Sequence, residues 1–225
     1  MNIIILPGLD GTGLLAPKLR HALEGNHSVT TLAYPPHLCR YEDILEWTKS
    51  QLPNDDFILV AESFSGPVAV LLGAEAPPKL KGIAFVATFA RRPVNLPVFL
   101  AYLIEIMPLR SWLIAKLAQP FLMGKWENRA FTDQFRQVLY KVPASILSKR
   151  LADVLKVDVV DALKRIDVPI LYLRATKDRL IPAKMAQDFA AVSGRVQDIE
   201  GPHFLLQARA DLAPAQIGHF ADNLE

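Results

Sequence analysis

The sequence predicts an α/β protein with one mainly parallel sheet of about six strands and helices on both faces. Apolar runs of strand length alternate with segments long enough for helices along most of the chain. Several of these runs are apolar without alternation, which is typical of strands covered on both sides. A length of 225 residues, 51% of them hydrophobic, is sufficient for one sizeable core. We therefore expect a single α/β core.

The predicted strands are short apolar runs rich in β-branched residues, and the first begins almost at the first residue. In chain order they are Asn2–Leu6, Ser28–Ala33, Phe57–Val60, Gly82–Thr88, Ile170–Arg174 and Val196–Ile199. The helices predicted between or after them are Leu14–Leu23, Tyr41–Gln51, Gly66–Ala76, Pro182–Ser193 and Pro214–Leu224. Crossover connections of this kind between parallel strands are right-handed almost without exception.

The alternation is interrupted between Thr88 and Ile170, where the sequence shows no convincing strand. Helix-like pieces punctuated by prolines occupy this interval, and Ser145–Ile166 carries apolar residues at helical spacing. Val98–Met123 is apolar nearly all round, and such a helix usually has two things to cover. The sequence thus predicts a core domain of residues 1–90 and 155–225, with a helical insertion, residues 91–154, after the fourth strand.

Composition excludes several functional classes. The 25 basic and 23 acidic residues leave a net charge of +2 without a block of like charge, unlike a nucleic-acid binder. Cys39 is the one cysteine, and no His or Cys spacing suits zinc, so we expect no disulfide, metal or cofactor. The N-terminus lacks the basic region of a signal peptide, and Leu96–Met107 is short of the roughly 20 residues that span a bilayer. We expect a cytoplasmic protein without stable membrane insertion, and the oligomeric state stays open.

The most informative motif follows the third predicted strand, where Ala61-Glu62-Ser63-Phe64-Ser65 leads into a helix. Small residues two positions either side of Ser63 allow strand and helix to approach closely, as in a nucleophile elbow. Ser65 is the competing nucleophile, but that frame needs a small residue where Pro67 stands. Pro67 instead suits a first helical turn. A serine that only caps the helix is the alternative interpretation.

Two further motifs follow the last two predicted strands. Asp178 lies in a strand-end loop before an apolar-Pro helix entry, and His203 lies in Gly201-Pro202-His203-Phe204. Taken alone, Asp178 is equally a turn or capping residue, and His203 is a candidate structural histidine. The rival acids, in or beside helical sequence or too near His203 along the chain, are Asp153, Asp158, Asp167, Asp198 and Glu200.

The order of Ser63, Asp178 and His203 on the ends of successive strands resembles the α/β-hydrolase fold superfamily, and in particular its serine carboxylesterase and lipase-like members. The resemblance covers essentially the whole chain. It implies a catalytic triad of Ser63 as nucleophile, His203 as base and acid, and Asp178 as the orienting acid. A serine hydroxyl is a poor nucleophile until a base removes its proton, and imidazole titrates close enough to neutrality to do so.

The loop Leu6–Gly13 follows the first strand, where relatives commonly read His-Gly-x. By that correspondence the backbone amides of Leu9 and Phe64 form the oxyanion hole, although Pro7 in place of His leaves the choice between Leu9 and Asp10 open. We expect the Asp10 carboxylate to brace the loop by accepting backbone N–H bonds. The glycines do not fit a nucleotide-binding Gly-x-Gly-x-x-Gly. The loop also resembles one in plant-type acyltransferases of this superfamily.

The insertion falls where the superfamily commonly places a lid. Apolar residues expected in a pocket ceiling are Phe99, Tyr102, Leu103, Ile106, Trp112 and Trp126. An apolar pocket suits acyl chains. The predicted function is hydrolysis of carboxylic esters with apolar short-to-medium acyl groups through an acyl-enzyme, with a small-molecule ester as partner. Acyltransferase, thioesterase and lactonase activities would use the same triad, and a non-catalytic ligand-binding protein is the alternative from another class.

Overall fold

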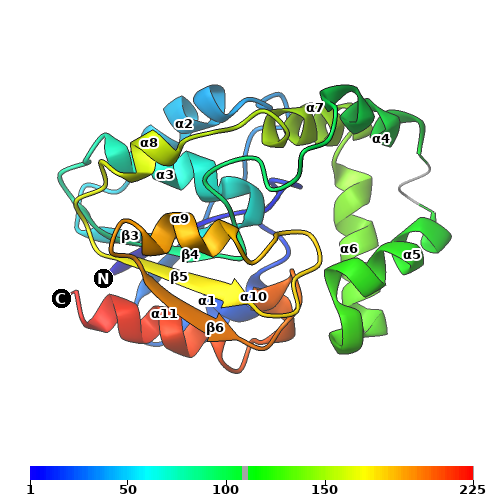
Figure 1. Ribbon diagram of the computed structural model, residues 1–225. Coiled ribbons are helices and arrows are strands. Elements are labelled where there is room, and N and C mark those ends of the chain that lie inside the picture. The colour runs from blue at the N-terminus through cyan, green and yellow to red at the C-terminus, as the bar shows by residue number, and fades with distance from the viewer. Residues whose placement is uncertain (108–110, 225) are drawn as a thin grey trace.

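The computed structural model describes residues 1–107 and 111–224 and contains the predicted parallel sheet (Figure 1). Its strands have the order β2-β1-β3-β4-β5-β6, and every neighbouring pair is parallel. They are β1 (Asn2–Leu6), β2 (Ser28–Thr31), β3 (Phe57–Glu62), β4 (Leu80–Val86), β5 (Ile170–Ala175) and β6 (Arg195–Ile199). Each predicted strand overlaps an observed one, so the fold prediction is confirmed.

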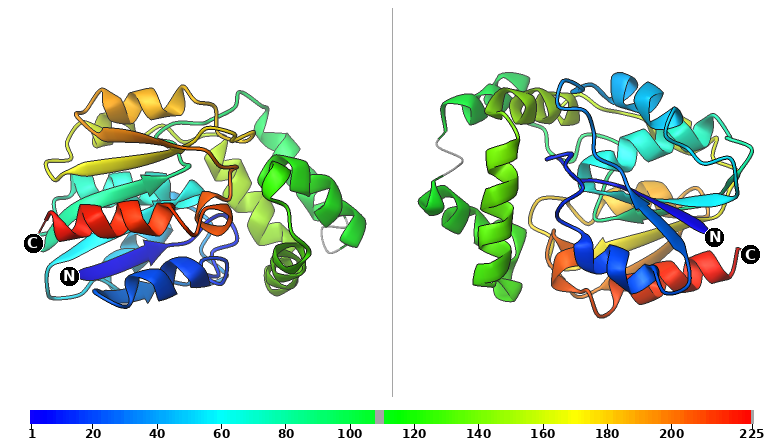
Figure 2. Two further views of the ribbon diagram at one scale, coloured as in Figure 1. Left: turned by 90° about the horizontal axis from the view of Figure 1, so that it is seen from below. Right: turned by 180° about the vertical axis from the view of Figure 1, so that it is seen from behind.

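Helices cover both faces of the sheet because successive strand residues point to opposite sides. In β1, Ile4 and Leu6 pack in one apolar cluster, whereas Ile3 and Ile5 pack in another. The helices of the first cluster are α2 (Tyr41–Lys49), α3 (Gly66–Ala74), α8 (Val160–Leu163), α9 (Met185–Ala190) and the end of α7 (Ala144–Val154). Those of the second cluster, seen together in Figure 2, are α1 (Pro17–Leu23), α10 (Leu205–Ala208) and α11 (Ala213–Asp222).

Several helix boundaries differ from the predicted ones. α1 begins at Pro17 instead of Leu14, because proline's fixed φ and missing N–H suit a first helical turn. α9 is shorter than the predicted Pro182–Ser193. The short α10, which begins two residues after His203, was not predicted.

The chain between β4 and β5 is helical, and the part of it that the structure describes adds no strand to the sheet. Its elements are η2 (Val98–Tyr102), α4 (Leu103–Ile106), α5 (Trp112–Leu122), η3 (Gly124–Trp126), α6 (Arg129–Lys141), α7 (Ala144–Val154) and α8. α5 and α6 lie beyond the sheet in Figure 1. α6 was not predicted, although Asn128 caps it by accepting the Phe131 N–H at 2.8 Å.

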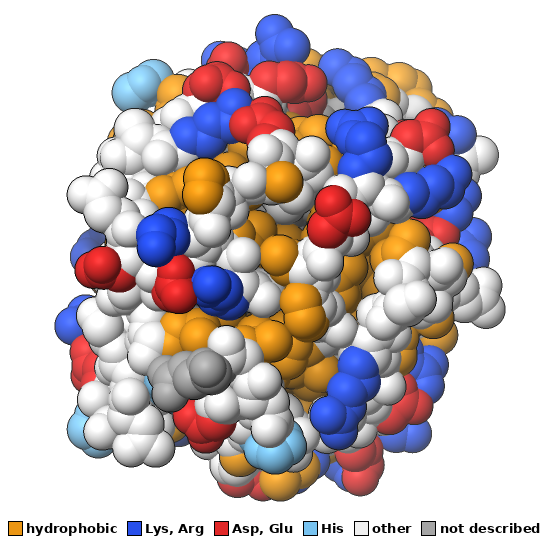
Figure 3. Space-filling model, turned by 90° about the vertical axis from the view of Figure 1, so that its left-hand side faces the viewer, with side chains coloured by type: hydrophobic (Ala, Val, Ile, Leu, Met, Phe, Trp, Pro, Cys, Tyr) orange, Lys and Arg blue, Asp and Glu red, His pale blue; other side chains and the backbone are white. Residues whose placement is uncertain are grey.

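The side of the molecule turned away from α5 and α6 has no single sign of charge. Lysine, arginine and acidic side chains are interspersed there around hydrophobic side chains that line a hollow (Figure 3). This agrees with a net charge of +2 spread along the chain. Within residues 1–107 and 111–224, the helices are all too short or too polar to cross a membrane.

Candidate active site

Ser63 occupies a strained turn between β3 and α3. Its φ of 49° lies in the left-handed region that non-glycine residues rarely adopt. Two contacts with Thr88, just after β4, hold the turn. The Ser63 carbonyl accepts a hydrogen bond from Thr88 Oγ1, and a side chain at Gly66 would clash with the same hydroxyl. The chain therefore turns sharply after β3, as expected of a nucleophile elbow.

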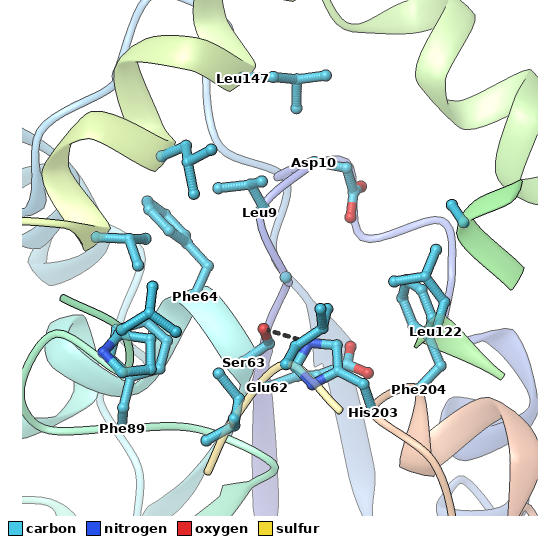
Figure 4. Close-up of a pocket in the computed structure, with 18 of the residues that line it drawn as sticks. Leu9, Asp10, Glu62, Ser63, Phe64, Phe89, Leu122, Leu147, His203 and Phe204 are labelled. Carbon is cyan, nitrogen blue, oxygen red and sulfur yellow. Dashed lines mark hydrogen bonds between the residues drawn. The ribbon is translucent and has the colours of Figure 1, made fainter. Parts of the chain in front are cut away.

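The structure brings Ser63, His203 and Asp178 into one hydrogen-bonded chain. Ser63 Oγ lies 2.9 Å from His203 Nε2, and His203 Nδ1 lies 2.9 Å from Asp178 Oδ2 (Figure 4 draws the first bond). Asp178 Oδ1 also accepts the backbone N–H groups of Leu180 and Ile181 at 2.8 and 2.9 Å. Asp178 is thus a turn residue and the partner of His203 at once, and the turn fixes which oxygen faces the imidazole.

Several of the rival residues have other partners. Ser65 is fully buried, donates to the Pro7 carbonyl and lies 2.6 Å from the Tyr34 hydroxyl. It therefore ties the turn after β3 to the loop after β1. Among the rival acids, Asp153 accepts the Tyr41 N–H at 2.8 Å and Asp198 pairs with Arg174.

The loop between β1 and α1 is braced from within. Asp10 Oδ1 accepts the Thr12 backbone N–H at 2.8 Å and the Thr12 hydroxyl, which agrees with the expected role of this carboxylate. The Gly11 N–H donates to the Gly8 carbonyl at 3.0 Å and closes a turn around Leu9. Figure 4 shows Leu9 and Phe64 on the same cavity as Ser63. Phe64 lies in the first turn of a helical segment, where backbone N–H groups lack intrahelical partners. The assignment of these amides to an oxyanion hole stays a prediction.

A cavity of about 490 Å³ opens above Ser63. This volume is in the range of small-molecule binding sites. Around Ser63 and His203, the loops at the strand ends contribute Gly8, Leu9, Asp10, Glu62, Phe64, Phe89, Arg179, Leu180, Ile181 and Phe204. The segment between β4 and β5 contributes Pro93, Val94, Leu96, Ile104, Ala118, Leu122, Phe135, Leu139, Leu147, Leu151, Val154 and Leu155. The residues that the segment between β4 and β5 contributes are all apolar.

Among the residues expected in the pocket ceiling, the five whose side chains are described do not line this cavity. Phe99 and Ile106 are 66% and 81% exposed, and Tyr102 and Leu103 are also exposed. Ile104 points inward from the same short helix instead. The other two expected residues are tryptophans. Trp126 packs against a separate cluster around Met123 and Phe131, and the side chain of Trp112 lies outside the described part of the structure.

Sequence reasoning missed the cavity residues on α6 and did not assign those on α7 to the pocket. Phe135 and Leu139 line the cavity from α6. The capping Asn128, followed by Phe131, Phe135 and Leu139 at helical spacing, was a usable signal for this helix. Leu147 and Leu151 belong to the stripe that did predict α7, but periodicity does not tell a pocket-lining face from a core-packed one.

Glu62 places an additional carboxyl group in the cavity. The side chain is buried directly before Ser63, and its Oε1 accepts a 3.1 Å hydrogen bond from Gln207 Nε2. Burial raises the pKa of Glu62 to about 7, against the lowering effects of the Gln207 hydrogen bond and of His203, while Asp10 raises it. This carboxyl therefore changes charge near neutral pH within the candidate site.

The described residues contain no group of three or more His, Cys, Asp or Glu side chains arranged to hold a metal ion. The polar groups that face the cavity beside Ser63 are instead His203, Glu62, Asp10 and Arg179. What this arrangement can do is proton transfer between a hydroxyl and an imidazole, next to an apolar binding space.

Comparisons with known proteins identify the family and the fold. The sequence model described as "Alpha/beta hydrolase family" matches residues 4–215. No curated protein sequence matches the chain. An esterase from Exiguobacterium antarcticum is similar in structure, with a TM-score of 0.86, 13% identity, and coverage of 99% of this chain and 92% of the esterase.

Two other solved structures are similar over nearly the whole chain. An enol-lactonase from Burkholderia xenovorans LB400 has a TM-score of 0.85 at 16% identity, covering 98% of this chain and 91% of that one. A hydrolase from Oleispira antarctica has a TM-score of 0.81 at 16% identity, covering 99% and 91%. At these identities the likeness is one of fold.

Proposed function

The chain belongs to the alpha/beta hydrolase family, and we propose that within it the protein is a serine carboxylesterase for esters with apolar, short-to-medium acyl groups. The observation that carries this proposal is the hydrogen-bonded chain from Ser63 through His203 to Asp178, opening into an apolar cavity. Each member has the partner that its role requires. The serine has a base, and the base has a carboxylate that orients it.

The reaction begins with attack of Ser63 Oγ on the ester carbonyl carbon. His203 Nε2 takes the hydroxyl proton as the new C–O bond forms, and the Asp178 carboxylate keeps Nδ1 protonated and stabilises the imidazolium. The carbonyl oxygen becomes an oxyanion, which we assign to the backbone amides of Phe64 and Leu9, with Asp10 as the alternative to Leu9.

Collapse of the tetrahedral intermediate breaks the bond to the alkoxy group. His203 returns its proton to the departing alcohol, and the acyl group stays on Ser63. A water molecule then attacks the acyl-enzyme by the same route, with His203 as base. The products are the free acid and the regenerated serine hydroxyl.

The substrate preference follows from the cavity lining. Apolar side chains from α5, α6 and α7 face the space above Ser63, so an acyl chain buried there leaves water at a gain of about 0.8 kcal/mol per methylene. We therefore assign the acyl group to this space. We also propose that residues 91–154 act as a lid domain on the core formed by residues 1–90 and 155–225.

A fluorophosphonate tests the nucleophile directly. We expect one adduct, found by mass spectrometry on the peptide that contains Ser63, and Ser63→Ala removes both the adduct and the hydrolysis of p-nitrophenyl esters. Ser65→Ala serves as the control for labelling position. Absence of an adduct in the folded protein would instead support a non-catalytic binding protein and overturn the proposal.

A substrate panel tests the bond type. Esters, thioesters, lactones and amides of varied acyl length are compared, with and without added alcohol. We expect the highest kcat/KM on esters with apolar acyl groups and free acid as the product. One similar structure is named an enol-lactonase, so the panel includes lactones for direct comparison with esters. Faster turnover of lactones or thioesters, or transfer to the alcohol, would assign one of those activities to the same triad.

A further inference from the structure

Arg150 is a buried cation that reaches from α7 to the loop between β1 and α1. Its side chain is only 1% exposed. Among the described residues it donates four hydrogen bonds, all to backbone carbonyls. Nη1 donates to Leu9 O at 3.1 Å and to Asp10 O at 2.8 Å. Nε and Nη2 donate to Leu38 O at 3.1 and 3.0 Å. One guanidinium thus links three parts of the chain.

The partners of Arg150 are unusual for a buried charge. No carboxylate in the described part of the chain forms a salt bridge with it. Burying a charge is costly unless hydrogen bonds satisfy it, and here carbonyl dipoles do so. The rings of Tyr34 and Phe64 lie 5.8 and 5.9 Å from the guanidinium carbon, within the range of cation–π attraction. Burial lowers the pKa of Arg150, although arginine stays protonated in proteins.

The loop sequence is matched to this guanidinium at Gly11. The residue has a φ of 71°, and a side chain there would occupy the position of Arg150 Nη1. Glycine is therefore required twice, by the backbone conformation and by the space. The opposite side of Gly11 is also fixed, because its carbonyl accepts the Tyr34 N–H at 2.8 Å.

The bonds to Arg150 determine where the loop amides point. In a trans peptide the C=O and the N–H face opposite directions. Holding Leu9 O therefore aims the Asp10 N–H away from Arg150. The Gly8 carbonyl is held by the Gly11 N–H, which in the same way aims the Leu9 N–H. Arg150 thus holds the peptide of the Asp10 N–H directly. It also holds Asp10 O, in the same peptide as the Gly11 N–H that fixes the Gly8 carbonyl, and so it acts indirectly on the peptide of the Leu9 N–H.

We propose that Arg150 is a positioning residue that preorganises the oxyanion-binding amides of the β1–α1 loop, so that α7 contributes to the chemical step as well as to the cavity. This rests on the proposed function. Amides that are already aimed at the developing oxyanion need no reorganisation during the reaction, and loss of one such donor lowers turnover by about 10²–10³. Lysine is a poor replacement, because one ammonium does not reproduce the planar fork that holds three carbonyls.

The test compares Arg150→Met, Arg150→Lys and the control Lys149→Met, an exposed neighbour on α7. Each is assayed for kcat and KM on a p-nitrophenyl ester. Each is also assayed for affinity toward an alkyl boronic acid, which forms a tetrahedral adduct on Ser63, and toward a plain alkyl alcohol, which occupies only the cavity. We expect Arg150→Met to lower kcat and boronate affinity together by about 10²–10³, with KM and alcohol affinity little changed. Arg150→Lys falls in between, and Lys149→Met behaves as wild type.

Three results would overturn the assignment. A folded Arg150→Met variant with wild-type kcat and boronate affinity shows that the amides need no such anchor. Parallel loss of alcohol affinity and kcat shows that Arg150 only maintains the cavity. If Arg150→Met does not fold, the test rests on Arg150→Lys, and a wild-type kcat for that variant would contradict the proposal. Failure of the proposed function is distinguishable, because the wild-type protein would then neither hydrolyse the ester nor bind the boronate.

Discussion

The floor and the roof of the cavity differ in chemistry and in origin. The floor consists of loops at the carboxyl ends of β1, β3, β4, β5 and β6 and carries Ser63, His203 and Glu62. Asp178 lies behind His203, bonded to its Nδ1. The roof comes from the segment between β4 and β5, and its lining is apolar. Loops at the carboxyl ends of parallel strands meet at one edge of the sheet, so polar groups far apart in sequence converge there. The helical segment between β4 and β5 is separate in sequence from the loops that carry these polar groups, so substitutions in its apolar lining need not alter the polar groups.

This difference teaches where each proposed property of the site would be encoded. On the proposed function, reactivity would depend on a few side chains held by the backbone, as when the turn at Leu180 and Ile181 fixes the Asp178 carboxylate. Substrate size would then depend on the bulk of the apolar roof residues. Arg150 departs from this division, because a roof helix supplies the side chain that holds a floor loop.

Asp178→Asn is expected to give the largest effect, and it concerns the floor alone. The asparagine oxygen must face the two backbone N–H groups, which leaves the NH₂ group toward His203 Nδ1. The imidazole is then held in the wrong tautomer, and kcat falls by about 10⁴. Steady-state kinetics measure this, with thermal unfolding to establish that the variant is folded.

The control for Asp178→Asn is Asp198→Asn, which alters a carboxylate paired with Arg174 on the surface. We expect near wild-type kcat for it. If Asp178→Asn kept more than about a tenth of the activity, a different group would orient His203, and the triad assignment would be wrong.

Glu62→Gln tests the effect of a buried floor carboxyl on stability. The folded-state pKa is about 7 and the ordinary value is 4.5, so the folded protein holds this proton more tightly than the unfolded chain does. The stability that this group contributes is present below pH 4.5 and is lost as the pH rises to about 7. Glutamine has no such loss, so the free energy of unfolding of Glu62→Gln relative to wild type rises by about 3 kcal/mol across this window.

Urea unfolding at pH 5 and at pH 8 measures the Glu62→Gln effect. Glu127→Gln is the control, because it removes the same charge from an exposed position. A stability difference between Glu62→Gln and wild type that is the same at both pH values would show that the carboxyl is ionised in the folded protein throughout.

The sequence predicted the sheet and the floor better than the roof, for physical reasons. Strands buried on both faces leave continuous apolar runs, and β1 was predicted with its observed bounds. The order of Ser63, Asp178 and His203 is visible because each follows a strand. When a helix is apolar all round, its sequence does not indicate which side faces the pocket. Phe99 and Ile106 were therefore expected to face the pocket but are exposed.

The contact of Arg150 with the β1–α1 loop was not predictable from the same patterns. A charged residue in an amphipathic helix is ordinarily assigned to the solvent-facing side. Its burial depends on carbonyls of Leu9, Asp10 and Leu38, which are far away in sequence and carry no side-chain signature. Gly11 is the residue in the sequence that this contact requires to be glycine. It does not predict the contact, because glycine is also common in loops that touch no buried side chain.

The smallest expected effect concerns the roof alone. Ala118 of α5 lines the cavity, whereas its neighbour Leu117 is 60% exposed. Ala118→Phe fills part of the space for the acyl chain without touching the triad. Because a difference of one methylene in an apolar pocket is worth about 10-fold or more in kcat/KM, we expect at least that loss on a decanoyl ester, with the acetyl ester little affected. Acyl-length profiles measure it.

Leu117→Phe is the matched control, since it adds an aromatic ring one residue away on the outer side of α5. It should leave the acyl-length profile unchanged. If both variants kept the wild-type profile, the acyl chain would not use the space beneath α5. If Ala118→Phe lowered kcat equally on acetyl and decanoyl esters, the roof would be acting on the reacting groups and not on chain length. Only a loss that depends on acyl length supports the proposal that floor residues perform the reaction and roof residues limit the length of the acyl chain.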